Sequence, residues 1–480
     1  MVFNSLEFLV FITLFLPAYF LTRGNIRLGV SLAASYIFYG WWDWRFLFLI
    51  IGTTVMDFYL GQRMEATMGE LPRRRLIAFS VVMNLTSLGF FKYFNFFIDS
   101  AQQSLHLLGY HAHFNTLHII LPVGISFYTF QSMSYTIDIY RHEIHAEKHF
   151  IRFATFVALF PQLVAGPIVR ARDFLPQLQQ DYTWDWNRFY SGMTRVVWGF
   201  FKKVAVADSL APFVDLVFNA PHQFNSINLL VALIFYAFQI YCDFSGYSDI
   251  AIGLARIMGF TFLENFKTPY GAQNFSVFWQ RWHISLSSWL RDYLYIPLGG
   301  NRHGALMTYR NNLLTMLIGG LWHGANWAFV FWGLLHGLYL IGQRLLTPAY
   351  TRMLHILKLS KWLQRGLNIT IVFALTCFAW IYFRAGAYGI RSFEVANTYI
   401  QGLFSLEGWN PATIQNKFWF IKNVFLIIIL LFVETTNHYW HYPKRIAQSP
   451  AFRMIAYAAV IWLILWMGTF GAKAFIYFQF

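Results

Sequence analysis

His323 is the residue whose type and surroundings most directly suggest chemistry. It lies in the strongly apolar run TMLIGGLWHGANWAFVFWGLLHGLYLIG (315–342), flanked by Gly319, Gly320 and Gly324. Histidine is the side chain best suited to proton transfer near neutral pH. Small neighbours let helices approach closely or let a substrate reach the imidazole. The pattern is compatible with a general base and equally with a structural hydrogen-bond partner, so both roles stay open.

The spacing of histidines and cysteines does not predict a metal site. HGANW lacks the i, i+4 pair of histidines typical of zinc sites, and no HExxH occurs in the sequence. Cys242 and Cys377 both lie in apolar runs, so neither a disulfide framework nor a cysteine metal site is expected. His336, in LLHGL, has no comparable glycine frame before it and provides an internal control for His323. We expect no metal and no resident cofactor.

A second segment, NFSVFWQRWHISLSSWLRDYLYIPLGGNR (274–302), interleaves aromatic bulk with charge. It contains Trp282, His283, Arg291 and Asp292. Aromatic and charged side chains on neighbouring helix faces are expected at an interface or at a cavity wall. In a membrane setting these tryptophans indicate interfacial anchors rather than stacking platforms for nucleic acid.

The segment LFPQLVAGPIVRARDFLPQL (159–178) combines helix-breaking residues with Arg170. Broken helices are tolerated at membrane depth only where protein or water covers the freed backbone groups. The segment is therefore either a re-entrant element that lines a cavity or an ordinary loop with interfacial arginines.

The segment YAFQIYCDFSGYSDIAIGLARIMGF (236–260) places acidic residues in a helix-length apolar stretch. Asp243 and Tyr247 are four residues apart and share a helix face, whereas Asp249 points elsewhere. The two carboxylates are thus not an obvious acid–base couple. They are either buried polar scaffolding or ligand contacts.

The elements that must position these residues are membrane helices. The 480 residues are 57% hydrophobic and 12% charged, with mean hydropathy +0.45, whereas soluble domains carry about 25% charged residues. Stretches such as 5–22, 44–61, 419–436 and 451–470 approach the roughly 20 residues that cross a bilayer, and similar runs suggest about ten to twelve spans. Lipid cannot satisfy backbone polar groups, so we expect an all-α, polytopic integral membrane protein.

The charge and texture of the chain refine this expectation. The net charge of +15 indicates positive-inside loops and anionic lipid headgroups rather than nucleic acid, and a cytosolic donor with phosphates would also suit it. No repeat or long linker is evident, so one membrane domain (1–480) is expected. Ionisable residues concentrate in about 115–345, which we interpret as the catalytic core region.

The tail AFIYFQF (474–480) surrounds a single phenol, Tyr477, with Phe475, Phe478 and Phe480. By composition alone, it is typical of an aromatic anchor at the membrane interface.

Together these segments resemble the membrane-bound O-acyltransferase superfamily, in particular its bacterial branch that modifies cell-envelope polymers. The resemblance is carried by FYTFQSMSYTIDIYR (127–141), PQLVAGPIVR, WHISLSSWLRDYLYIPLGG, GGLWHGANW and the tail. It implies a ring of tilted helices around a thinned centre, with a central funnel near the histidine.

The resemblance also implies roles for individual residues. The catalytic base of the family corresponds to His323, and the second polar position corresponds to His283, 40 positions earlier, as an orienting or oxyanion-stabilising group. Tyr477 corresponds to a tyrosine that is proposed as a covalent acyl carrier. A phenol ester suits this role, because it is a more activated acyl donor than an alkyl ester. The candidate substrate-binding residues of these segments are Arg170, Asp243, Trp282, Arg291, Asp292 and Asn326.

The function implied is that of an O-acetyltransferase subunit with several passes through the bacterial inner membrane. It would draw acetyl from acetyl-CoA and export it to a separate periplasmic SGNH-type acetyltransferase, which would modify a polysaccharide such as alginate. Peptidoglycan and cellulose are alternative acceptors. Alternatives from other classes are a secondary transporter and a non-catalytic scaffold of a polymer synthase.

Overall fold

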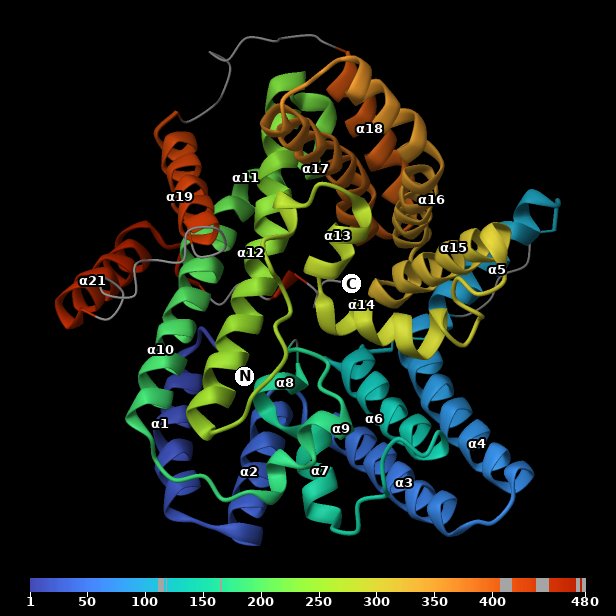
Figure 1. Cartoon of the computed structure of the whole chain (residues 1–480), viewed down its shortest axis with the longest axis vertical. Helices are drawn as coiled ribbons and strands as arrows, with labels where there is room; N and C mark the ends of the chain where they lie inside the picture. Colours follow the sequence, from blue (N-terminus) through green and yellow to red (C-terminus); the bar gives the residue numbers. More distant parts are fainter. Residues whose placement is uncertain are drawn as a thin grey trace. The chain divides into compact units, whose positions relative to one another are not determined.

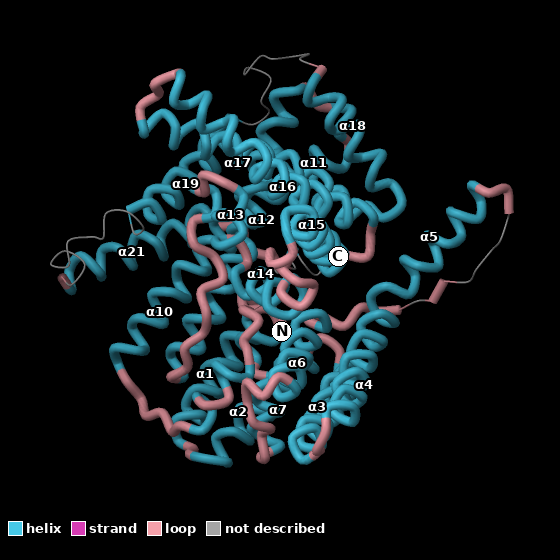
Figure 2. Tube along the Cα trace, turned by 45° about the vertical axis from the view of Figure 1, so that its right-hand side comes forward, coloured by secondary structure: helices cyan, strands magenta, loops and turns pink. Residues whose placement is uncertain are grey.

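A computed structural model describes residues 1–110, 116–117, 119–164, 166–405, 417–436, 449–471 and 475–476. The described residues form helices joined by loops and contain no strand (Figure 1, Figure 2), which confirms the all-α prediction. The chain divides into two compact units, the first made of Met1–Val196 and Ile250–Leu263 and the second of Val197–Asp249 and Glu264–Phe480. Whether these form one functional domain stays a prediction.

The first unit is built mainly from the N-terminal helices. Its elements are α1 (Leu6–Leu21), α2 (Gly24–Gly40), η1 (Trp44–Phe46), α3 (Leu47–Ala66), α4 (Glu70–Leu88), η2 (Gly89–Tyr93), α5 (Phe94–Leu107), α6 (Ile125–Tyr140), α7 (Phe150–Ala158), α8 (Phe160–Leu163), α9 (Ala171–Phe174), η3 (Gln177–Gln179) and most of α10 (Trp186–Phe200). Buried polar contacts join three of them. Asp57 of α3 accepts hydrogen bonds from Ser80 (2.7 Å) and Asn84 (2.9 Å) of α4 and from Ser132 of α6. Such bonds hold helices together where lipid supplies no hydrophobic drive.

The second unit contains the histidine-bearing segments. Its elements are η4 (Phe201–Ala207), α11 (Asp208–Asn219), η5 (Pro221–Gln223), the larger part of α12 (Ser226–Met258), η6 (Pro269–Gly271), α13 (Phe275–Arg281), α14 (Ile284–Leu290), η7 (Arg291–Tyr295), α15 (Gly304–His323), α16 (Trp327–Ile356), α17 (Lys361–Ala385), η8 (Gly386–Arg391), α18 (Ser392–Phe404), α19 (Lys417–Thr435) and α21 (Pro450–Met467). Of these, η4 and η7 are turns of π-helix, a form that often occurs at functional sites.

The length and apolarity of the helices are those of a multi-pass membrane protein. In the part of the chain that the structure describes, six helical stretches are long and apolar enough to cross a membrane, and two shorter apolar helices accompany them. Some of the remaining helices, such as α14 and α15, are shorter or more polar. The expected ten to twelve spans stay a prediction, as do the ring and its funnel.

Close backbone packing between α15 and α16 positions His323 (Figure 2). A Cβ atom at Gly320 would overlap the carbonyl oxygen of Phe329, and one at Gly333 would overlap that of Met316. Asn326 begins α16, because its Oδ1 accepts a hydrogen bond from the N–H of Ala328 (2.8 Å). The turn after His323 is thereby held between two helices in backbone contact.

We expect Gly333→Ala to destabilise the protein by about 1–3 kcal/mol, because the added methyl group forces two backbones apart. Gly342→Ala is the matched control on the same helix, since a Cβ there has no atom within 4 Å. Alanine at Gly342 should be neutral or slightly stabilising. The apparent unfolding midpoint in detergent checks both variants, and equal midpoints would contradict the proposed close contact.

Candidate functional site

His323 is the last residue of α15 and is buried in an aromatic enclosure. Its ring centroid lies 5.1 Å from that of Trp322, 5.0 Å from that of Trp332 on α16 and 5.2 Å from that of Phe383 on α17. All three rings meet the imidazole edge-on at 71° to 89°. Three helices therefore fix the orientation of this imidazole and limit its contact with water.

His283 is the second histidine of the site. It lies between α13 and α14 and is fully buried, and its ring centroid is 6.5 Å from that of His323. The fold thus brings together two histidines from separate segments. Burial lowers the pKa of His283 to about 3, so its imidazole is neutral at pH 7 and can donate a hydrogen bond from one ring nitrogen only.

The backbone of His283 adopts the left-handed conformation, with φ 44° and ψ 55°. This conformation is uncommon for residues other than glycine and persists only where surrounding contacts enforce it. Asn265 supplies several of them. Its backbone oxygen accepts from the N–H of Ile284 (2.9 Å), and its Oδ1 accepts from Ser285 Oγ (2.9 Å) and lies 3.2 Å from His283 Nδ1.

A further contact holds Asn265 itself. Its Nδ2 donates to Ser248 Oγ on α12 (3.1 Å), which orients the amide so that its oxygen faces the His283 turn. Asn265 is therefore a positioning residue for His283. Nothing in the sequence around it, FLENFKTP, distinguishes it from an ordinary loop asparagine, so sequence reasoning missed it.

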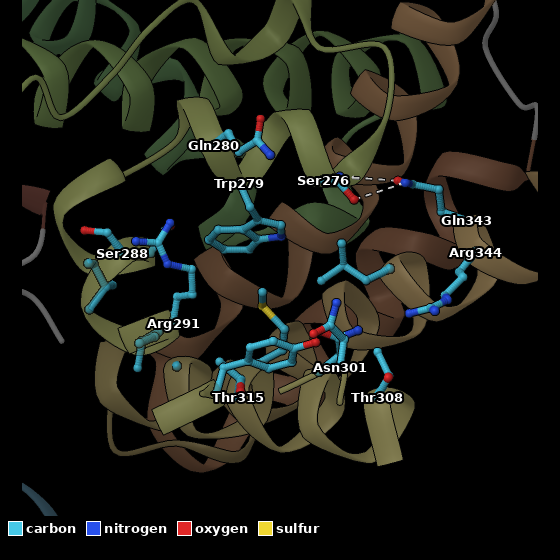
Figure 3. A pocket seen from close by; sticks show the side chains of 18 of the residues that line it. Ser276, Trp279, Gln280, Ser288, Arg291, Asn301, Thr308, Thr315, Gln343 and Arg344 are labelled. Atoms are coloured by element: carbon cyan, nitrogen blue, oxygen red, sulfur yellow. Dashed lines mark hydrogen bonds between the residues drawn. The ribbon is translucent and has the colours of Figure 1, made fainter. Parts of the chain in front are cut away.

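A cavity of about 790 Å³ opens beside His323 (Figure 3). Trp279 of α13 projects into it, with Arg291 of η7 on one side and Gln343 and Arg344 of α16 on the other. No Asp or Glu stands among the described residues that line it. The cavity is therefore apolar at the histidine and cationic at its sides.

Hydrogen bonds join α13 and α16 in the cavity wall. Gln343 Oε1 accepts from the N–H of Phe275 (2.7 Å). Two further bonds, dashed in Figure 3, join Gln343 to Ser276: Oε1 accepts from the N–H (3.3 Å), and Nε2 donates to Oγ (3.1 Å). Arg344 was not predicted from the sequence. Arg344 lies well beyond the start of α16, whereas His323 ends α15. It reaches the cavity because α16 packs against α15.

Four predicted substrate-binding residues lie in the second unit near these elements. Trp282 is fully buried and stacks on Phe278, with ring centroids 5.7 Å apart. Arg291 lines the cavity and pairs with Asp292 (2.6 Å). Asn326 caps α16, and its Nδ2 also donates to the carbonyl oxygen of Gly389 (2.7 Å). These contacts show positioning roles; binding of substrate by these residues stays a prediction.

Two other predicted site residues, Arg170 and Asp243, do not line the cavity. Arg170 is buried in the first unit, beside the start of α9. Asp243 is buried on α12, where it pairs with Lys203 of η4 (2.6 Å). Tyr477 lies outside the described residues. His336, the internal control, is buried between aromatic rings and stacks on Phe278 at 5.9 Å.

The arrangement suits general-base chemistry on a substrate bound in the cavity. His323 faces the cavity, and His283 stands behind it as a neutral, fixed partner. Among the described residues, no group of three or more His, Cys, Asp or Glu is placed to hold a metal ion. The chemistry that the side chains themselves support is proton transfer at His323.

Comparison with known proteins identifies the family of this chain. Residues 145–389 match the family model MBOAT, the membrane-bound O-acyltransferase family. The chain is 45% identical to the probable alginate O-acetylase AlgI of Azotobacter vinelandii over 85% of this chain and 79% of that protein. It is 37% identical to the peptidoglycan O-acetyltransferase of Helicobacter pylori over 78% of this chain and 73% of that protein.

A more distant similarity is to the teichoic acid D-alanyltransferase of Bacillus subtilis, which is 28% identical over 55% of this chain and 69% of that protein. Both histidines, Asn265 and the cavity residues fall within the segment that the family model matches, residues 145–389. The resemblance inferred from the motifs is therefore confirmed. The chain belongs to the membrane-bound O-acyltransferase family, and it is a multi-pass membrane O-acyltransferase.

Proposed function

We propose that this protein is the membrane subunit of an O-acetyltransferase that moves acetyl from cytosolic acetyl-CoA across the bacterial inner membrane. The acceptor would be an exported polysaccharide such as alginate. The observation that carries the proposal is His323, enclosed by aromatic rings at the edge of a cavity and 6.5 Å from His283. The similarity to alginate O-acetylases supports the acyl group and the acceptor class.

The cavity suits a thioester donor that carries phosphates. Its volume of about 790 Å³ lies within the usual range of small-molecule sites. Arg344 supplies positive charge, as does Arg291, whose guanidinium also pairs with Asp292 outside the lining, and no acidic residue stands among the described lining. The donor's phosphates would bind near these arginines while the thioester approaches His323.

Acyl transfer in this site needs a base and a group that stabilises the oxyanion. His323 would remove the proton from an attacking hydroxyl, whose oxygen then bonds to the thioester carbonyl carbon. The carbon–sulfur bond breaks, and the thiolate takes the proton from the His323 imidazolium. His283, neutral and held by Asn265, would orient the reacting groups, because its single ring proton lies on Nδ1, which faces Asn265 Oδ1.

The attacking hydroxyl in this proposal is the phenol of Tyr477. The described residues that precede it support the idea, because the ring of Phe475 lies 5.4 Å from that of Phe244, whose ring is 4.5 Å from that of His283. The tail thus contacts the ring beside the second histidine. The acyl-tyrosine would pass acetyl to a periplasmic SGNH-type transferase, and that enzyme to the polymer.

Peptidoglycan is the second candidate acceptor, favoured by the similarity to the Helicobacter pylori enzyme. Cellulose is a further alternative. Membership of an acyltransferase family favours an enzyme over a secondary transporter or a non-catalytic scaffold. Acetylation measured on alginate, cellulose and peptidoglycan with the purified membrane subunit and its periplasmic partner distinguishes the acceptors.

We expect His323→Phe to lower acetyl transfer at least about 100-fold, since general-base catalysis contributes roughly 10²–10⁴-fold. Phenylalanine keeps a ring in the enclosure and removes the base. His336→Phe is the matched control, because this buried histidine has neither ring nitrogen hydrogen-bonded within the described part of the chain. Transfer from labelled acetyl-CoA, normalised to folded protein, is the measurement. Wild-type transfer by His323→Phe would refute the base assignment.

We expect Tyr477→Phe to abolish covalent labelling of the protein by labelled acetyl-CoA, because the variant keeps the ring and lacks the ester oxygen. Tyr59→Phe, at an exposed tyrosine, is the control and should label normally. The label should be stable on a denaturing gel and released by base. Persistent labelling of Tyr477→Phe would leave the tail only its role as an anchor.

We expect Asn265→Ala to lower kcat about tenfold or more, because misplacing a reacting group by about 1 Å can cost 10²-fold. The KM for acetyl-CoA should change little. Asn265→Asp retains the Oδ1 acceptor for Ser285 and should recover part of the rate. Ser248→Ala, which removes only the outer contact, should have a smaller effect. Equal rates for Asn265→Ala and wild type would exclude this positioning role.

A further inference from the structure

Five charged side chains are buried where η4 meets α11 and α12. Lys203 Nζ lies 2.6 Å from Asp243 Oδ1 and 2.9 Å from Asp208 Oδ1, and Lys202 pairs with Asp249. The π-helical turn lets two consecutive lysines both face the protein interior, where each meets its own carboxylate of α12. Burial alone would lower the pKa of Lys203, but the two carboxylates outweigh burial and raise it. Lys203 therefore stays charged.

The second oxygen of Asp243 holds the C-terminal segment. Its Oδ2 accepts a hydrogen bond from the backbone N–H of Ile476 at 2.7 Å. A bond from a backbone N–H to a carboxylate is charge-assisted and stronger than a neutral one. Asp243 is 3% exposed and Ile476 is 4% exposed, so water does not compete for this bond.

Ring contacts from the same helix complete the binding surface. Phe475 is buried, with its ring centroid 5.4 Å from that of Phe244 and 5.2 Å from that of Tyr247. Asp243, Phe244 and Tyr247 thus contact two successive residues of the tail. The shared face of Asp243 and Tyr247, expected from their spacing, is the face that Phe475 and Ile476 contact.

The chain is also fastened shortly before this point. The N–H of Thr469 donates to the carbonyl oxygen of Val204 in η4 (3.2 Å), and Lys422 Nζ donates to that of Met467 (3.0 Å). Ser209 Oγ donates to the same Met467 oxygen (3.1 Å). The described chain is therefore attached to the second unit at residues 467–469 and again at 475–476.

We propose that Asp243, held by Lys203, is a positioning residue that fixes the register of the tail through the Ile476 amide. The inference rests on the proposed function, in which Tyr477 accepts the acyl group. Because the carboxylate binds a backbone N–H, the bond does not involve the phenol oxygen. The same contact can therefore hold the tail before and after acylation of Tyr477, without any change in the atoms that form it.

Hydrogen exchange at the Ile476 amide tests the contact directly, on the full-length protein in detergent. Asp243→Leu removes the acceptor, while Lys203 keeps Asp208 as its partner. We expect exchange in the peptide that contains Ile476 to accelerate about tenfold or more, as for loss of a hydrogen bond to a charged group. Asp243→Asn keeps an acceptor oxygen and should show a smaller increase.

Asp249→Leu is the matched control. It removes a buried carboxylate from the same helix and breaks the Lys202 pair, and the described residues 475–476 donate no hydrogen bond to Asp249. Exchange at Ile476 should stay at the wild-type rate in this variant. Unchanged exchange in Asp243→Leu, or equal acceleration in Asp249→Leu, would overturn the proposal.

Covalent acetyl loading from labelled acetyl-CoA gives the second measurement. Loading by folded Asp243→Leu should fall about tenfold or more, as expected when a reacting group is misplaced, with the KM for acetyl-CoA unchanged and partial recovery in Asp243→Asn. Normal loading in Asp243→Leu would refute the positioning role. If Tyr477→Phe still labels, the proposed function fails, and hydrogen exchange still decides whether Asp243 holds the tail.

Discussion

The backbone contact between α15 and α16 is the constraint on which the site depends. Two glycines, Gly320 and Gly333, remove the side chains that would otherwise separate these helices. The turn that follows His323 is short, because the next helix, α16, starts directly after Asn326. The side chain of Asn326 caps the first turn of α16. The imidazole is consequently held at the end of one helix and beside the first turns of another, where rotation of either helix would move it.

Aromatic packing fixes the orientation of the two imidazole rings, a task that hydrogen bonds perform in many water-filled sites. Rings of Trp322, Trp332 and Phe383 surround His323, and Phe244 meets His283 edge-on at 4.5 Å. Edge-to-face packing fixes ring orientation without adding buried polar groups that would need partners. Polar contacts support the backbone turn at His283, where Asn265 holds a left-handed conformation that histidine disfavours.

Basic side chains have different surroundings at two places in the second unit. At the cavity, Arg291 and Arg344 face an opening in which charge can meet a ligand or solvent. Between η4 and α12, Lys202 and Lys203 are enclosed and paired with carboxylates. Basic residues of a membrane protein usually lie in the loops on one membrane face. An additional residue in the π-helical turn instead directs both lysines inward.

The sequence by itself determined the helical, membrane-embedded class, because composition and run length reflect the solvent in which the chain folds. Its motifs also determined the family and singled out His323 and His283, because ionisable residues are unusual in apolar surroundings. Only the tertiary structure decided their 6.5 Å separation, the role of Asn265, the cavity with Arg344, and the bond from Ile476 to Asp243. Those features join residues up to 233 positions apart, and no local pattern records which distant partner a side chain will meet.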